Sequence, residues 1–124
     1  MNLLMVFLGG GLGAVSRYLL SRLIYSHYSG GFPLGTLVIN LTGCLVIGFL
    51  GGISERWAFP PHLRLFVFIG ILGGYTTFSS FGLETITLIR GGEWQYAVSN
   101  ILISNLGGLA LVFGGFVLGK FLAR

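Results

Sequence analysis

Four long apolar stretches, separated by short turns rich in polar residues, glycine and proline, dominate the sequence. They cover about residues 3–25, 34–54, 63–90 and 96–121 of the 124. A helix needs roughly 20 apolar residues to cross a bilayer, and each stretch reaches that length. The pattern predicts an all-α membrane protein with four transmembrane helices. Because little chain remains outside them, we expect residues 1–124 to form a single integral membrane domain.

The third stretch is interrupted in its middle by residues 73–81, which read Gly-Gly-Tyr-Thr-Thr-Phe-Ser-Ser-Phe. Backbone that leaves the helix at membrane depth is tolerated only where protein or a water-filled cavity satisfies its polar groups. Polar residues at this depth usually mark an ion or substrate path. We therefore expect a break in helix three that belongs to an ion-binding or permeation element.

Charge is sparse and weakly asymmetric. Charged residues make up 8% of the chain and the seven basic ones are scattered, so no basic face forms for a nucleic-acid partner. If the two termini and the loop of residues 55–62 share one side of the membrane, that side carries Arg56, Arg64, Lys120 and Arg124. The positive-inside rule then favours a cytoplasmic N-terminus only mildly, because Arg22 and Arg90 lie opposite. So weak a bias leaves room for insertion in both orientations, and hence for an antiparallel dimer.

Glycines occur in pairs spaced four residues apart in all four stretches. The pairs are Gly9/Gly13, Gly48/Gly52, Gly70/Gly74 and Gly115/Gly119. Such small-residue pairs let helix backbones approach closely in lipid. We expect most of them to pack within one subunit and some to form a subunit interface.

Neutral hydrogen-bond donors gather on helices two and four. Asn40 lies four residues after Thr36, which places both on one side of helix two. A polar stripe along helix four consists of Tyr96, Asn100 and Ser104. Ser79 and Ser80 add hydroxyl groups at the break. Each residue alone is consistent with an ordinary interhelical hydrogen bond, but amide and hydroxyl donors in a continuous set favour an anion path.

Two phenylalanines and two charged residues lie close to this polar set. Phe78 and Phe81 are one turn apart and project to the same side if the segment is helical. Rings turned edge-on stabilise an anion, rings presented face-on favour a cation, and core packing is the simpler alternative. Arg17, inside helix one, either raises the anion concentration in a vestibule or pairs with Glu84 or with carbonyls at a helix end. Glu84 belongs to that pair or to a pore mouth.

No catalytic constellation is evident. His27 and His62 lie in turns without companions at metal-ligand spacing. Two of the three carboxylates also lie in turns, and no Ser–His–Asp set is indicated. Cys44 is the only cysteine, which excludes an intrachain disulfide. We do not expect an enzyme.

Three motifs follow one another along helices one, two and three. They are Gly10-x-x-Gly13-Ala14-x-x-Arg17-Tyr18, Gly35-Thr36-Leu37-x-x-Asn40-x-x-Gly43 and Gly73-Gly74-x-Thr76-Thr77-Phe78-Ser79-x-Phe81. In these motifs, and over essentially its whole length, the chain resembles the Fluc/CrcB fluoride channel family. The three motifs in this order and spacing are specific, whereas one alone would not be.

The resemblance implies an antiparallel, dual-topology homodimer with two fluoride pores and a structural sodium ion at the two-fold axis. By position, backbone carbonyls of Gly73 and Thr76 would hold the sodium. Phe78 and Phe81 would line the pores, with Asn40 as a donor near them. The polar track would comprise Ser79, Ser80, Tyr96, Asn100 and Ser104, and the vestibule Arg17, Thr36 and Glu84. Ser80 stands where threonine is common in the family and Asn100 where serine is frequent, and both keep a donor.

The expected function is passive, fluoride-selective export across a bacterial plasma (inner) membrane. A negative-inside voltage drives an anion outward at about 2.3 kcal/mol per 100 mV, so neither an ATP motif nor proton coupling is needed. A small proton-coupled multidrug exporter is the main alternative, but it needs a carboxylate in helix one, where this chain has Arg17. A non-transporting membrane subunit would explain the glycines but neither the donor stripe nor the break.

Overall fold

The computed structural model describes all residues, 1–124, and consists of helices joined by short connections. The first two spans are α1 (Asn2–His27) and α2 (Leu34–Ser54). The third contains α3 (Pro61–Arg64), the π-helical segment η1 (Leu65–Leu72), α4 (Gly73–Tyr75) and α5 (Phe78–Arg90). The fourth contains α6 (Trp94–Leu102), the π-helical segment η2 (Ile103–Gly107) and α7 (Gly108–Leu122).

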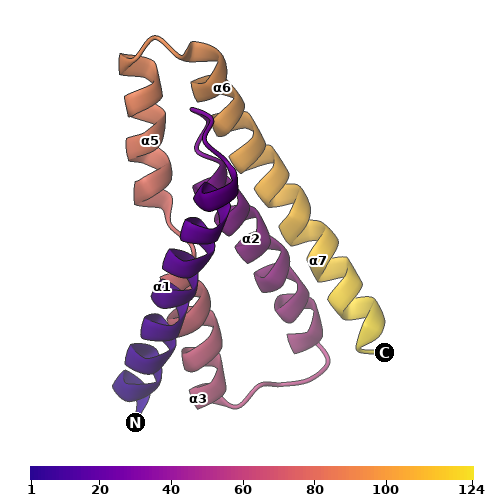
Figure 1. Cartoon of the computed structure of the whole chain (residues 1–124). Coiled ribbons are helices and arrows are strands. Elements are labelled where there is room, and N and C mark those ends of the chain that lie inside the picture. Colours follow the sequence, from indigo (N-terminus) through magenta and orange to yellow (C-terminus); the bar gives the residue numbers. More distant parts are fainter.

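Four helical spans are long and apolar enough to cross a membrane, which confirms the prediction of an all-helical chain with four such helices. Both termini and the connection from α2 to α3 lie at one end of the molecule (Figure 1). The connections from α1 to α2 and from α5 to α6 lie at the other end. The chain is thus a multi-pass membrane protein in which each span reverses the direction of the one before it.

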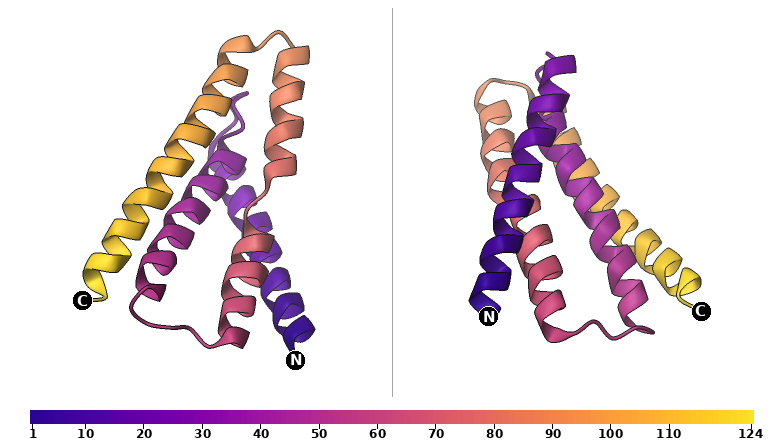
Figure 2. Two further views of the ribbon diagram at one scale, coloured as in Figure 1. Left: turned by 180° about the vertical axis from the view of Figure 1, so that it is seen from behind. Right: turned by 60° about the horizontal axis from the view of Figure 1, so that its bottom comes forward.

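The spans associate as two closely packed pairs. α1 lies against η1 and α4, and α2 lies against α7. The two pairs diverge toward the end that carries the termini, as both views in Figure 2 show. α5 and α6 complete the opposite end as an antiparallel hairpin. Contacts between the two pairs are sparse along most of their length, which leaves space between α2 and the third span.

Glycines determine how closely the two helices of each pair approach each other. A methyl group on Gly13 would overlap the carbonyl oxygen of Ile71 and lie 2.8 Å from the amide nitrogen of Tyr75. A methyl group on Gly115 would lie 2.9 Å from the amide nitrogen of Phe49. Gly9 and Gly13 face the third span, and Gly48 and Gly52 face α7. All four spaced glycine pairs are therefore used inside the chain.

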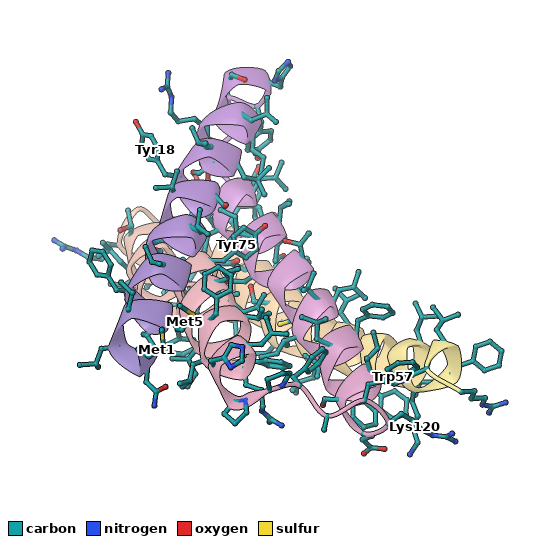
Figure 3. All side chains as sticks on the ribbon, turned by 90° about the horizontal axis from the view of Figure 1, so that it is seen from below. Met1, Met5, Tyr18, Trp57, Tyr75 and Lys120 are labelled. Carbon is teal, nitrogen blue, oxygen red and sulfur yellow. The ribbon has the colours of Figure 1, made fainter.

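The outer surface of these pairs is apolar, and only 20 of the 124 residues are buried. At the end that carries the termini, polar contacts join α7 to the connection after α2. Lys120 Nζ lies 2.8 Å from Glu55 Oε2, and Trp57 Nε1 donates to the carbonyl of Ala123 over 3.1 Å. Figure 3, seen from this end, shows Lys120 and Trp57 on one side of the molecule and Met1 on the other.

We expect Gly13→Ala to lower the thermal unfolding temperature of the purified protein, because the added methyl group overlaps backbone that has no room to move. Overpacking of this kind costs about 1–3 kcal/mol. Gly11→Ala is the matched control, since a methyl group at Gly11 meets no atom within 4 Å. Equal unfolding temperatures for the two variants in the same detergent would contradict close packing at Gly13.

Candidate functional site

The candidate site is built around two extended residues in the third span. α4 ends at Tyr75, and Thr76 follows with φ −83° and ψ 155°. Thr77 has φ −148° and ψ 114°, and α5 begins at Phe78. These residues lie near the middle of the span from Pro61 to Arg90. Their backbone groups therefore lie at membrane depth without the partners that a continuous helix would supply.

Asn40 on α2 supplies two of the missing partners. Its Nδ2 donates to the carbonyl of Thr77 over 2.9 Å, and its Oδ1 accepts from the Thr77 amide over 2.8 Å. One side chain thereby satisfies both backbone groups of an extended residue. The sequence predicted Asn40 as a donor near the rings, and this geometry leaves one Nδ2 hydrogen free for that role.

The interruption also frees particular carbonyl groups. The last carbonyls of a helix lack helical partners, and here the carbonyl of Gly74 accepts from Arg17 Nε over 3.2 Å. In a continuous helix the carbonyls of Gly73 and Thr76 would pair with the amides of Thr77 and Ser80. Those two amides donate instead to Asn40 Oδ1 and to Thr77 Oγ1. The two carbonyls predicted to bind sodium have thus lost their helical partners.

Thr77 also begins the next helix. Its Oγ1 accepts from the amide of Ser80 over 3.2 Å, which is the N-cap interaction of α5. Ser79 and Ser80 place hydroxyl groups within 3.3 Å and 3.1 Å of the same oxygen. The start of α5 carries the partial positive charge of a helix N-terminus. Several hydrogen-bond donors therefore gather at the interruption.

A cavity of about 370 Å³ lies beside the interruption, between α2, the third span and η2. We call it the central cavity. It is lined in part by Asn40, Gly73, Thr76, Thr77, Phe78 and Ser104. Residues predicted from three separate spans are therefore brought to one place. No charged side chain lines this cavity.

The two phenylalanines are in contact but differ in exposure. Their ring centroids are 5.4 Å apart and the ring planes are inclined by 43°. Phe78 lines the central cavity and is 79% exposed, whereas Phe81 is 8% exposed. The exposed ring is free to be covered by another molecule, and the buried ring supports it from the base of α5.

The three residues predicted for a vestibule separate into two places. Glu84 Oε1 accepts from Thr36 Oγ1 over 2.8 Å, while Glu84 Oε2 is buried without a partner. Glu84 lines a second cavity of about 330 Å³, the end cavity, together with Tyr25 and the connection between α1 and α2. Arg17 lies elsewhere, at the carbonyl end of α4, which was one of the alternatives that the sequence left open.

The polar stripe of the fourth span passes from the end of the molecule toward the central cavity. The ring of Tyr96 packs edge-on against Phe32, with centroids 5.6 Å apart. Ser104 lines the central cavity and donates to Asn100 Oδ1 over 3.3 Å. Asn100 is only 1% exposed, and its Nδ2 donates to Thr85 Oγ1 over 3.0 Å. Within the stripe only Asn100 and Ser104 are joined by a hydrogen bond, and the middle residue, Asn100, is enclosed by protein.

Sequence reasoning missed two threonines of this site. Thr77 was recognised only as a motif position, although a threonine before a helix that resumes is a common N-cap. Thr85 was not considered, although it lies four residues after Phe81 and therefore on the same helical face.

We expect Asn40→Ala to accelerate hydrogen exchange of the Thr77 amide about tenfold, because the variant removes the only acceptor of that amide and a bond worth roughly 1.4 kcal/mol. Exchange measured by NMR or mass spectrometry in lipid nanodiscs reports this. Asn105→Ala is the control, since Asn105 bonds only to the carbonyl of Ile101 on its own helix. An unchanged Thr77 exchange rate would mean that Asn40 does not hold the interruption.

Comparison of the sequence with known proteins places this chain in a family. The family model described as CrcB-like protein, Camphor Resistance (CrcB), matches residues 4–116. A protein of Hydrogenobaculum sp. is 47% identical over 123 residues, covering 98% of this chain and 100% of the relative. A protein of Desulforapulum autotrophicum is 44% identical over 116 residues, covering 93% of each. A protein of Coxiella burnetii is 45% identical over 126 residues, covering 100% of this chain and 98% of the relative.

All three relatives carry the name fluoride-specific ion channel FluC, a channel and not an enzyme, as the sequence predicted for this chain. The match extends through all four spans, so the interruption and the polar stripe both lie within the region shared with these relatives. The resemblance that the three motifs indicated is thereby confirmed, and the chain belongs to the CrcB family.

Proposed function

We propose that this protein is a passive, fluoride-selective ion channel. The observation that carries the proposal is the central cavity at the interrupted third span, where neutral hydrogen-bond donors and an exposed ring meet at membrane depth. The names of the relatives support fluoride as the anion that is conducted. No charged side chain in the cavity is available for proton coupling, which supports passive conduction.

The chemistry of the lining suits a small anion. Fluoride can only accept hydrogen bonds, so a pore must replace its hydration water with donors. Ser104 and the free hydrogen of the Asn40 amide are donors of this kind in the lining. The hydroxyls of Ser79 and Ser80 lie beside Thr77, which also lines the cavity. The positive edges of the Phe78 and Phe81 rings would add attraction for an anion that passes between them. Thr36 and Glu84 would form the approach from the end cavity.

A second copy of the chain is part of the proposal. The central cavity exposes Gly73 and other polar backbone at membrane depth, where lipid offers no hydrogen bonds. A partner chain that covers this face would satisfy these groups. The bias of basic residues toward one end is weak, with four at the end of the termini and Arg22 and Arg90 opposite, which supports an antiparallel arrangement in which the two chains insert in opposite directions. Two-fold symmetry would then give two equivalent pores.

The free carbonyls support a sodium ion at the centre of such a dimer. Unwound backbone carbonyls and the carbonyl ends of half-helices coordinate sodium in other membrane proteins. Gly73 and Thr76 offer carbonyl groups of both kinds, because the amides that would pair with them are bonded elsewhere. The residues present therefore fit the ion, which would neutralise the partial negative charge of two facing helix ends.

We propose further that the channel resides in the bacterial plasma (inner) membrane and exports fluoride from the cytoplasm. The relatives come from bacteria, in which the cytoplasm is held at a negative potential. That potential moves an anion outward by about 2.3 kcal/mol per 100 mV, so no energy source of its own is required.

The function is tested by anion efflux from liposomes that contain the purified protein, under a voltage set by potassium and valinomycin. We expect fast fluoride efflux without chloride efflux. Phe78→Ile and Phe81→Ile should each abolish fluoride efflux and leave the assembly intact, because Ile fills space without offering a ring edge. Phe113→Ile is the matched control, as Phe113 lies on α7 and is 71% exposed away from the central cavity. Undiminished efflux in the Phe78 or Phe81 variant would remove the role assigned to the rings.

Sodium removal provides a separate test. Protein purified and reconstituted with sodium replaced by N-methylglucamine should lose both its dimeric mass in light scattering and its fluoride efflux, and restored sodium should return both. The physical reason is that the facing carbonyl ends of α4 repel one another without a cation between them. Unchanged mass and efflux without sodium would exclude Gly73 and Thr76 as ligands of a structural ion.

A further inference from the structure

A chain of hydrogen bonds, buried at Thr85 and Asn100 and partly buried at Ser104, connects α5 to the polar stripe of the fourth span. Ser104 Oγ donates to Asn100 Oδ1 over 3.3 Å, and Asn100 Nδ2 donates to Thr85 Oγ1 over 3.0 Å. Thr85 Oγ1 in turn donates to the carbonyl of Phe81 over 2.7 Å. Thr85 is 6% exposed and Asn100 is 1% exposed. The proposed ion path uses Ser104 and Asn100 but assigns no role to Thr85.

The direction of these hydrogen bonds follows from Thr85. A hydroxyl group has one hydrogen to donate, and the short bond to the Phe81 carbonyl uses it. Thr85 Oγ1 can therefore only accept from its second neighbour, so the Asn100 atom that faces it is the amino group and not the carbonyl oxygen. Asn100 Oδ1 then faces Ser104, and only the Ser104 hydroxyl can supply the hydrogen between them. A single threonine thus fixes the orientation of the Asn100 amide.

This direction matters for the central cavity. Ser104 lines the cavity, but its hydrogen points toward Asn100, so at rest the hydroxyl presents lone pairs to the cavity. An acceptor-only ion gains a donor from Ser104 only by drawing that hydrogen away from Asn100. The Ser104–Asn100 distance of 3.3 Å is long for an O–H···O bond, whose usual length is about 2.7–2.8 Å. The hydrogen is therefore weakly held and turns at little cost.

We propose that Thr85 is a positioning residue for ion conduction, an inference that rests on the function proposed above. Thr85 fixes the Asn100 amide, and through it keeps the Ser104 hydrogen turned away from the central cavity until an anion arrives. If the Ser104 hydroxyl donates to the ion only temporarily and then donates to Asn100 again, the ion is held briefly. A hydrogen that faced the cavity permanently would bind the ion more tightly and release it more slowly.

Thr85→Val tests this because valine keeps the shape of threonine but accepts no hydrogen bond. The Asn100 amide then loses its fixed orientation and can turn its amino group to Ser104, which directs the Ser104 hydrogen into the cavity. We expect single-channel fluoride currents to saturate at a lower fluoride concentration and to reach a lower maximum. Each value should fall about three- to tenfold, the range that one interhelical hydrogen bond supports.

Thr87→Val is the matched control for the amide exchange of Asn100. Because Thr87 lines the end cavity, the control for the currents is Thr85→Ser. Thr87 lies on the same helix, and its hydroxyl donates to the carbonyl of Leu83 over 2.8 Å, as that of Thr85 does to Phe81, but it has no partner on α6. Thr85→Ser should keep wild-type currents, since serine retains the hydroxyl oxygen that accepts from Asn100. In an Asn100→Ser background the shorter side chain no longer reaches Thr85, so Thr85→Val should then have no further effect. Thr85→Ala serves as a second variant where valine impairs assembly.

A second readout does not require fluoride. Protein labelled with ¹⁵N in asparagine and held in nanodiscs reports the side-chain amide of Asn100, assigned by its absence in Asn100→Ser. Its hydrogens should exchange slowly with water in the wild type and in Thr87→Val, and faster in Thr85→Val. This measurement stands even if the wild-type protein carries no fluoride current, a result that would overturn the proposed function instead.

Each outcome decides the proposal. A lower saturating concentration that is absent from Thr85→Ser, together with faster Asn100 exchange that is absent from Thr87→Val, supports it. Currents and Asn100 exchange in Thr85→Val that equal those of the wild type overturn it. A change in exchange without any change in current also overturns it, because Thr85 would then hold Asn100 without acting on conduction. A lower current with an unchanged saturating concentration assigns Thr85 a structural role only.

Discussion

The pair of hydrogen bonds between Asn40 and the backbone of Thr77 is the interaction on which the rest of the site depends. An extended residue at membrane depth is costly unless another part of the protein satisfies its amide and carbonyl. Once Asn40 does so, α4 ends with carbonyls that have no helical partner, and α5 starts with a threonine cap. The same two bonds therefore place a helix end with partial negative charge and a helix start with partial positive charge within a few residues of each other.

The glycine pairs lie away from the interruption, but they fix the helix positions that let Asn40 reach Thr77. Close backbone approach joins α1 to the third span and α2 to α7, and these two pairs are packed tightly enough to be stable without filling the space between them. The central cavity lies in that space. Bulky residues at the glycine positions would move the helices apart within each pair and change where Asn40 meets Thr77. Membrane helices lack a hydrophobic force that would hold such a cavity open or closed, so shape complementarity decides its size.

Much of the fold was predictable because membrane spans leave a strong signal in composition. The four spans follow from apolar length, and the glycines and hydroxyls of residues 73–81 marked the position of the extended Thr76 and Thr77. The π-helical segments η1 and η2, which carry Phe68 and Ser104 to the central cavity, were not predictable, because apolar sequence has no clear signature for a five-residue hydrogen-bond spacing.

The hydrogen-bond partners of individual side chains could not be predicted from the sequence either. Arg17 had three possible roles, and only the packing of α1 against α4 brings its Nε to Gly74. Thr85 was not predicted as a site residue, because a threonine within a helix usually bonds only to its own helix backbone. The second bond of Thr85, to Asn100, exists only because α6 lies beside α5.

Hydrogen-bond direction links these observations. In the chain of hydrogen bonds that joins the stripe to α5, every bond runs one way, from Ser104 through Asn100 and Thr85 to the carbonyl of Phe81, because a backbone carbonyl can only accept. Under the proposal for Thr85, Ser104 donates to the ion only while the ion is present and otherwise donates to Asn100. Directing these hydrogens into a backbone acceptor would achieve this with neutral side chains. In the proposed channel, the absence of charge from the central cavity then follows from the same principle, because a fixed cation there would bind fluoride too strongly for it to leave.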